Sequence, residues 1–487
     1  MKILENSVED LIVLLDEVTR ATPDGKRFME PSSGVLKQAK SKRHHVVFGR
    51  RGSGKSSLLQ KTKNDIEGEA VGIYIDVEAL NENQYPDVLI LVLINILKEL
   101  RESVFKKFWF FQKRSLKKKL KESTEQLNSL LLAEDFAQLE TRTKSLKTCT
   151  SSLDLLISEP AKANLSESTS TEDENKEVFQ RSKINILNRN ISNIISLLKE
   201  SREALDKPIY LLIDDLYHIK KSNQPDLLSF LHKIAKNNGI WLKVGTVRFR
   251  SDLYRVDEKP VGVKLGDDVS EIDLDLTLEK MNTTKKFLQK LATELVFEAT
   301  TLNLDDLINP NAFDRLIIGS GGVSRDFINL MRQSILNARE RLNQNPEHPK
   351  GHRVSVEDVN EASGAYGSFK KEEFNKDSHD SKDTLDQVFA EIRSFCVDQA
   401  NSNCFLLPQD NDDILIDELV DLKLIHKIDP RVTVSKRQGR VYRAMMLDLS
   451  EYAGSRTIRK FETIDFWKQN EKEKLRRVKL IYQQNEN

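Results

Sequence analysis

A glycine-rich segment between residues 44 and 60 has the residue types and spacing of a phosphate-binding loop. Gly49 is followed by four residues and then by Gly54, Lys55 and Ser56. In this pattern backbone N–H groups surround a phosphate, the lysine reaches the β- and γ-phosphates, and the serine hydroxyl binds Mg²⁺. We therefore expect ATP or GTP as the ligand. The residues expected to contact it are Gly49, Arg50, Arg51, Gly52, Ser53, Gly54, Lys55, Ser56 and Ser57.

Two carboxylates farther along the chain would complete such a site. Asp214 and Asp215 follow an apolar run over residues 208–213, which predicts a buried strand that ends in acidic groups. We expect Asp214 to hold Mg²⁺ through water and Asp215 to orient or deprotonate the attacking water. An apolar run before two aspartates is weak evidence for a nucleotide site by itself. It becomes strong evidence when the same chain also contains the phosphate-binding loop.

Further polar residues are expected near the γ-phosphate. Thr246 lies at the end of an apolar run over residues 240–247, and Arg248 and Arg250 follow. From a strand beside the acidic one, Thr246 can face the γ-phosphate. An arginine just past it can reach this nucleotide or one on a neighbouring subunit. Exposure to solvent is an equal alternative for both arginines.

A parallel sheet is needed to position these residues. Apolar runs alternate with segments of helical spacing, which predicts an α/β fold for residues 1–276. The segment before the first strand contains Phe28 and Met29, and in nucleoside-triphosphatases of this type it often lies over the base. Ordinary packing of these two side chains is the favoured alternative. The predicted strands cover residues 46–48, 71–77, 208–213, 240–247, 261–265 and 271–276.

The chain between the second strand and Asp214 is longer than one crossover needs, so about residues 105–200 form a predicted insertion. Its composition fits two antiparallel helices joined by a disordered tip at about residues 158–176. Its first part mixes lysines with aromatic residues, which could bind nucleic acid or a membrane surface. Packing of the aromatic residues against the returning helix is the favoured alternative. The aromatic residues of this first part are Phe105, Phe108, Trp109, Phe110 and Phe111.

Residues 277–366 predict a helical lid after the sheet. A glycine-marked turn leads into a helix that carries Arg325 in its first turn. A cation there is unfavourable against the helix dipole, so its position suggests an anionic partner. The alternative is a surface ion pair with Asp326 or Glu340.

The pattern changes again toward the carboxyl end. Residues 367–382 predict a linker, and residues 383–450 predict a winged-helix-like domain whose last two strands meet at a basic turn. Residues 451–487 predict a charged tail with a helix over residues 465–484. The basic residues that could contact DNA from the wing are Lys436, Arg437 and Arg440.

Composition limits the remaining choices. The 76 Lys and Arg residues balance 76 Asp and Glu residues, so any contact with nucleic acid must be a local basic patch. No apolar run is long enough to cross a bilayer, and the chain does not start like a signal peptide, so we expect a cytoplasmic protein that does not enter a membrane. The odd, scattered set of Cys149, Cys396 and Cys404 argues against a disulfide framework or a metal site.

The phosphate loop, the Asp-Asp strand, the helical segment with Arg325 and the terminal winged helix together resemble the origin-recognition (initiator) clade of AAA+ ATPases. The resemblance is greatest to its bacterial branch, which is associated with anti-phage defence or mobile elements, and it covers about residues 1–104 and 205–450. It implies a Walker A loop with Gly49, Gly54, Lys55 and Ser56. It also implies that Walker B ends at Asp214 and Asp215, that Thr246 is sensor 1 and that Arg325 is sensor 2.

Two departures from the family pattern favour a slow switch over a motor. Asp215 stands where the family usually has a longer Glu, and Thr246 stands where it usually has Asn. We expect an ATPase whose nucleotide state gates assembly on DNA or on an effector protein, as a homo-oligomer or with that partner. The alternative is a STAND-like signalling ATPase, or a slow or non-hydrolysing ATP-dependent scaffold that does not bind DNA.

Overall fold

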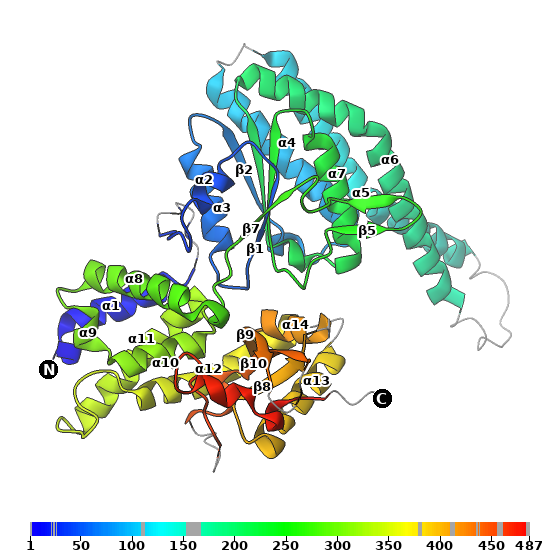
Figure 1. The fold of residues 1–487 in the computed structure, drawn as a ribbon. Coiled ribbons are helices and arrows are strands. Elements are labelled where there is room, and N and C mark those ends of the chain that lie inside the picture. Colours follow the sequence, from blue (N-terminus) through cyan, green and yellow to red (C-terminus); the bar gives the residue numbers. More distant parts are fainter. Residues whose placement is uncertain are drawn as a thin grey trace.

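The structure of the 487-residue chain is a computed structural model. Figure 1 shows a core that contains the main sheet, with a helical part and a C-terminal domain lying together on one side of it. The described residues are 2–20, 22, 25, 27–108, 113–151, 167–377, 382–409, 414–434, 437, 439–454 and 461–483.

A five-stranded sheet forms the centre of the core, with strand order β2-β3-β4-β1-β7. Its four strand pairings are all parallel, so the carboxyl ends of the strands share one edge. β1 and β3 are buried along their whole length, as expected of strands covered on both faces. The prediction of an α/β fold with a parallel sheet is confirmed. The strands are β1 (His45–Phe48), β2 (Val71–Asp76), β3 (Ile209–Asp214), β4 (Ile240–Thr246) and β7 (Ser270–Asp273).

Helices cover both faces of the sheet. α2 (Val35–Ala39) and α3 (Lys55–Asp65) pack on the face that contains Val47. α4 (Asp87–Lys107) and α7 (Gln224–Ala235) pack on the face that contains Val46. Neighbouring strand residues enter opposite clusters because side chains alternate along a strand. A small hairpin of β5 (Tyr254–Val256) and β6 (Pro260–Gly262) follows β4.

Two long helices form the insertion and project from the core (Figure 1). They are α5 (Arg114–Ser151) and α6 (Glu167–Leu205). Lys183 on α6 is 2.8 Å from Asp87 at the start of α4, which fixes the base of the hairpin. Phe108 packs against the core cluster, whereas Trp109, Phe110 and Phe111 lie outside the described residues. Of the expected disordered tip, residues 158–166 also lie outside them, and α6 includes the remainder.

Helices from two distant parts of the chain form the lid. α1 (Asn6–Glu17) packs with α8 and α11 in one cluster, in which Leu11 and Leu15 share a core with Leu288. The sequence prediction placed residues 1–276 together, but the apolar stripe of α1 is buried against the lid. The lid helices are α8 (Met281–Ala299), α9 (Leu304–Leu307), α10 (Pro310–Ser320), α11 (Ser324–Gln344) and α12 (Val356–Asp377).

The C-terminal domain contains an antiparallel sheet with strand order β8-β10-β9. The turn between β9 and β10 has the position of a wing. Between β8 and β9 the described residues contain one helix, α14, where a full winged-helix motif has two. The elements are α13 (Lys382–Ser394), a π-helical turn (Phe395–Gln399), β8 (Cys404–Pro408), α14 (Ile414–Asp421), β9 (Ile425–Thr433) and β10 (Val441–Leu447).

Two expectations about this half of the chain are wrong. Residues 367–377 continue α12 instead of forming a linker, because Lys370 is buried and its ammonium lies 2.7 Å from Asp448. The predicted tail helix at residues 465–484 is replaced by short 3₁₀ turns at Lys472–Arg476 and Val478–Leu480. Leu480 and Tyr482 bury their side chains against the domain, and this anchors an irregular chain.

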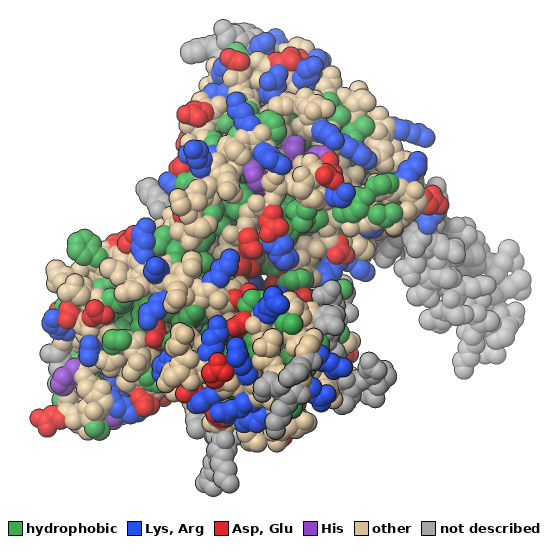
Figure 2. Space-filling model, viewed as in Figure 1, with side chains coloured by type: hydrophobic (Ala, Val, Ile, Leu, Met, Phe, Trp, Pro, Cys, Tyr) green, Lys and Arg blue, Asp and Glu red, His purple; other side chains and the backbone are tan. Residues whose placement is uncertain are grey.

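Surface charge follows the composition. On the face drawn in Figure 2, basic and acidic side chains are interspersed over both the core and the C-terminal domain. Within the described parts of the chain, none of the helices combines the length and apolar character that crossing a membrane requires. Other 3₁₀ turns are Lys2–Leu4, Glu78–Leu80, Leu216–His218, Lys221–Asn223, Leu278–Lys280 and Leu449–Glu451.

Candidate functional site

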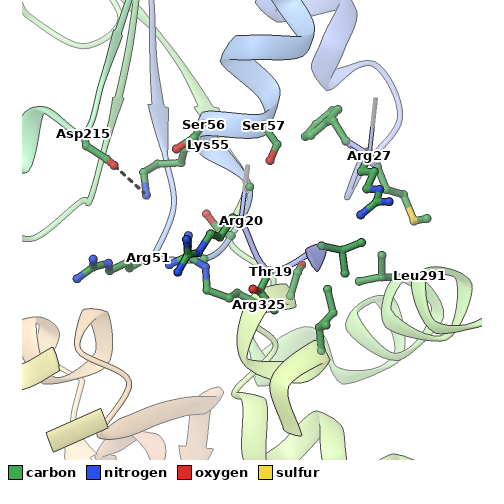
Figure 3. Close-up of a pocket in the computed structure, with 18 of the residues that line it drawn as sticks. Thr19, Arg20, Arg27, Arg51, Lys55, Ser56, Ser57, Asp215, Leu291 and Arg325 are labelled. Carbon is green, nitrogen blue, oxygen red and sulfur yellow. Dashed lines mark ion pairs between the residues drawn. The ribbon is translucent and has the colours of Figure 1, made fainter. Parts of the chain in front are cut away.

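A pocket of about 150 Å³ lies where the phosphate loop, the N-terminal segment and the lid meet (Figure 3). The loop supplies its floor, and the lid closes the opposite side. Three separate segments therefore have to fold correctly before the pocket exists. Its lining includes Val18, Thr19, Arg20, Arg27, Phe28, Met29, Arg51, Gly52, Ser53, Gly54, Lys55, Ser56, Ser57, Glu78, Asp215, Phe287, Leu291, Ser324, Arg325 and Ile328.

The loop has the backbone conformation that phosphate binding requires. Gly52 and Gly54 have φ of 90° and 100°, a region that other residues rarely adopt. Gly54 is the residue before α3, so the N-terminus of that helix faces the pocket. Lys55 is only 4% exposed, and its ammonium donates a 2.9 Å hydrogen bond to the carbonyl of Gly49. The lysine is therefore held directly above the loop.

Arg50 does not take the role that the sequence suggested. Its side chain is buried and faces the lid, where the guanidinium donates to the carbonyls of Leu276 (2.8 Å) and Gly321 (3.0 Å). It also lies 3.3 Å from Asp275. Because these acceptors satisfy it on the far side of the loop, Arg50 joins the loop to the lid and leaves the pocket lining to Arg51.

The two carboxylates lie at the carboxyl end of β3. Asp214 is 1% exposed and accepts a 2.6 Å hydrogen bond from the Tyr74 hydroxyl, and the Ser56 side chain also donates to it. Burial, together with the charge of Asp215, raises the pKa of Asp214 to about 6. Asp215 adopts a left-handed backbone conformation and lies 4.0 Å from the Lys55 ammonium (Figure 3).

This group of oxygen atoms fits a magnesium ion. A hydroxyl from Ser56 and a carboxylate from Asp214 meet beside the phosphate loop, and such hard oxygen donors suit Mg²⁺. Burial is the main cause of the raised pKa of Asp214, and a divalent cation beside this carboxylate would favour its ionised form. Asp215, unlike Asp214, belongs to the lining of the pocket.

Thr246 lies at the adjacent strand end and is fully buried. β4 pairs with β3 so that Ile213 is opposite Val244, which places Gly245 beside Asp214. A side chain at Gly245 would begin 2.7 Å from an oxygen of Asp214, so glycine is required there. The hydroxyl of Thr246 contacts that of Ser251 in the loop that follows the strand.

Arg325 reaches the pocket from the lid (Figure 3). Its backbone N–H donates to the carbonyl of Gly52 at 3.2 Å, so the first turn of α11 rests on the phosphate loop. Asp326 is not its partner, since that carboxylate is buried and pairs with Lys423 at 3.1 Å. The alternative of a surface pair with Asp326 is therefore wrong, and Arg325 lines the pocket.

The arginines after β4 lie elsewhere. Arg248 pairs with Glu271 and Asp273 on β7, and Arg250 stacks 4.8 Å from the ring centroid of Tyr217. Neither is part of the pocket lining.

Several lining residues were missed or only suggested by the sequence. Glu78 lies in the short turn after β2, and Arg20 follows α1. Tyr74 on β2 does not line the pocket but donates to Asp214. Nothing in their local sequence distinguishes them, since each reaches the site only through the fold. Phe28 and Met29 do line the pocket, opposite lid residues, which agrees with the suggested position near a base.

The proposed wing is only partly described. Arg437 and Arg440 are exposed, and Lys436 lies outside the described residues. In a winged-helix domain the recognition helix comes directly before the two strands of the wing, and α14 has that position in the chain. It contains three acidic residues and no basic one. These are Asp417, Glu418 and Asp421.

No protein-family model matches the chain, and no curated protein sequence does. Similar solved structures include a Walker-type ATPase of Pyrococcus abyssi, with 13% identity, a TM-score of 0.40, and coverage of 90% of this chain and 98% of that one. The ORC1 protein of Aeropyrum pernix in complex with DNA has 12% identity, a TM-score of 0.36, and coverage of 90% and 93%. Cdc6p of Pyrobaculum aerophilum has 11% identity, a TM-score of 0.32, and coverage of 85% and 87%.

Proposed function

We propose that this protein is a magnesium-dependent ATPase of the AAA+ initiator type that acts as a nucleotide-controlled switch. The observation that carries the proposal is the convergence of Lys55, Asp215 and Arg325 on one pocket, from the loop, the sheet and the lid. A binding site for phosphate alone would not need the lid arginine. A site that distinguishes ATP from ADP would need such an arginine, because the two nucleotides differ in the γ-phosphate.

Each residue has a definite task in this proposal. The loop N–H groups and Lys55 bind the β- and γ-phosphates, and Ser56 and Asp214 would hold Mg²⁺. The metal would neutralise charge that develops on the phosphate oxygens. Asp215 orients the attacking water and accepts its proton as the bond from the γ-phosphorus to the bridging oxygen breaks. Arg325 stabilises the transferred phosphoryl group.

The test is the turnover of Asp215→Ala. Removing this carboxylate should leave ATP binding intact and stop hydrolysis, because its role begins after the nucleotide is in place. Asp267→Asn, which changes an exposed carboxylate on the core surface, is the matched control. Unchanged turnover in Asp215→Ala would transfer the base role to another carboxylate, and Glu78 is the nearest one in the pocket lining.

We also propose a scaffold role without DNA binding as the second candidate function. The placement of α14 favours it, because this helix has no basic residue and its Glu418 and Asp421 carboxylates contact Lys221 and Phe249 of the ATPase core instead of facing a DNA groove. If Arg437 and Arg440 contact DNA instead, affinity for a duplex should fall steeply with added salt. Absence of duplex binding at low salt, with and without ATP, would decide for the scaffold.

We further propose, from the sequence resemblance, a role in anti-phage defence, with a homo-oligomer or an effector protein as the partner. A toxin, nuclease or transposase gene beside this one would support that role. Measurement of the molar mass with ATP and with ADP would show whether assembly depends on the nucleotide.

A further inference from the structure

Two contacts join one short segment of the C-terminal domain, residues 418–427, to the loop after β4 and to the lid. At the first, the backbone N–H of Phe249 donates a 2.8 Å hydrogen bond to the carboxylate of Asp421. At the second, the ammonium of Lys423 lies 3.1 Å from the carboxylate of Asp326. Phe249 is three residues after Thr246, and Asp326 follows Arg325 directly. Both residues expected to sense the γ-phosphate are therefore close to the same segment.

The contact at Asp421 fixes the loop after β4. Asp421 is 7% exposed, and burial raises the pKa of its carboxyl to about 7. The carboxyl can accept from the Phe249 N–H in either protonation state, so the tie does not depend on its charge. Lys427 adds a second contact, with its ammonium 5.1 Å from the Phe249 ring centroid. Because the Ser251 hydroxyl in this loop contacts Thr246, a shift of the loop would move the Thr246 hydroxyl.

The contact at Lys423 fixes the first turn of α11. Asp326 is fully buried and Lys423 is 4% exposed, so the ion pair is screened little by solvent. The Tyr366 hydroxyl also donates to Asp326, at 3.1 Å. A buried pair of this kind tolerates little displacement, since either charge left alone would be strongly unfavourable. The backbone at Asp326 is thereby held where Arg325 enters the pocket.

We propose that Asp421 and Lys423 are positioning residues for ATP hydrolysis, acting through the Thr246 loop and through the helix turn that carries Arg325. The proposal rests on the proposed ATPase function. It means that two specific contacts made when the C-terminal domain is seated on the core, rather than the tightness of the seating itself, set the rate of turnover. By reciprocity, a nucleotide that prefers the seated arrangement strengthens the seating.

This assignment gives the acidic face of α14 a partner within the chain. Glu418 on the same helix accepts a 2.6 Å hydrogen bond from Lys221 of the core, so three acidic or basic contacts hold the segment against the ATPase. Among the described residues, Glu418 forms no hydrogen bond or ion pair with the loop after β4 or with α11, although it lies at the same interface. It therefore offers a matched control that loosens docking without touching either sensor.

The experiment compares Asp421→Ala and Lys423→Met with Glu418→Ala in the full-length protein, measuring ATP affinity and kcat separately. We expect Asp421→Ala to lower kcat at least tenfold with nearly unchanged ATP affinity, because a misplaced catalytic environment costs rate more than binding. Lys423→Met should lower kcat similarly and also weaken ATP affinity relative to ADP. Asp421→Asn, which keeps an acceptor oxygen, should restore most of the rate, and Glu418→Ala should change it less than threefold.

Equal losses in all three variants, or none in Asp421→Ala while the wild type hydrolyses ATP, would overturn the positioning role alone. No hydrolysis by the wild type would overturn the proposed function instead. If Asp421→Ala does not fold, hydrogen exchange on the wild type decides. Residues 247–251 and 418–424 should then gain protection together on addition of a non-hydrolysable ATP analogue, and independent responses would contradict the proposal.

Discussion

Two buried lysines lie at opposite ends of the central sheet, and their surroundings differ. Lys55, at the carboxyl end, is 4% exposed, lines a pocket and lies 4.0 Å from Asp215. Lys243, near the amino end of β1, is fully buried. Its ammonium donates to the carbonyls of Ser41 and Arg43, both at 2.7 Å, and lies 2.9 Å from Nδ1 of His45.

The difference shows that burial of a charge does not by itself mark a functional site. Neutral acceptors surround Lys243, and burial lowers its pKa to about 7, so its environment favours the uncharged amine. Lys55 keeps a carboxylate nearby and an open side where an anion can approach. Lys243 joins chain segments, whereas Lys55 is placed to bind a ligand.

The largest expected effect separates these two lysines directly. Lys55→Met should lower ATP affinity about a hundredfold or more, because several charge-assisted hydrogen bonds to phosphate are lost. Lys243→Met should leave ATP affinity within about twofold, since its contacts are far from the pocket. Calorimetric titration with ATP and Mg²⁺ provides the measurement, and circular dichroism confirms folding. A similar loss in both variants would remove the distinction.

The site at the carboxyl end of the sheet also depends on a group outside the sheet, the Arg325 side chain from the lid. If Arg325 pairs with the γ-phosphate, Arg325→Ala should reduce the preference for the closed lid with ATP by about tenfold to a hundredfold. The ATP-bound variant should then resemble the ADP-bound wild type in small-angle scattering. Arg332→Ala, on the same helix but paired with Asp16, is the control. Compaction of Arg325→Ala with ATP would show that the lid closes without this arginine.

Two strand glycines, one at each end of the sheet, can be replaced by alanine to test how much space each end leaves for a side chain. Gly245→Ala would place a methyl group 2.7 Å from an oxygen of Asp214 and should lower Mg²⁺-dependent ATP affinity about tenfold. Gly72→Ala, near the amino end of β2, would meet the Lys63 side chain at 3.0 Å, with the Lys63 Cα and Ile66 in ordinary contact at 3.4 and 3.5 Å. It should leave affinity unchanged in the same titration. Equal affinities in the two variants would mean that Asp214 can move without cost.

The sequence predicts one end of the sheet much better than the other. The phosphate loop and the strand before Asp214 are local patterns, because glycines, an apolar run and carboxylates sit within a few residues of one another. Lys243 interrupts a strand and gives no local sign of its burial. Its acceptors come from a segment about 200 positions away in the chain, which is a tertiary property.

The same reason explains the errors in the site and the lid. Arg50 belongs to the loop pattern, yet acceptors at Leu276 and Gly321 turn its side chain toward the lid. The apolar stripe of α1 can be seen in the sequence, but it does not say which neighbour buries it. In α12, the helix continues into the predicted linker as far as Asp377, because Lys370 gains a buried partner in Asp448.

The smallest expected effect is a pH dependence from the amino end. The folded-state pKa of Lys243 is about 7, below the value of about 10.4 for an unfolded lysine. Between these values the unfolded chain binds a proton that the folded chain does not, so the contribution of Lys243 to stability rises with pH. The slope cannot exceed about 1.4 kcal/mol per pH unit. The pKa of His45 is lowered to about 4, chiefly by burial, so this neighbour stays neutral throughout the window.

Thermal unfolding of the wild type and Lys243→Met from pH 7 to pH 9 isolates this term, since the two proteins share every other titrating group. The wild type should gain stability relative to the variant as pH rises, by about 1 kcal/mol for the first unit. Loss of the hydrogen bonds to Ser41 and Arg43 adds an offset that does not change with pH. Parallel pH profiles would show that Lys243 stays charged when folded, and its neutral acceptors would then not explain the contrast with Lys55.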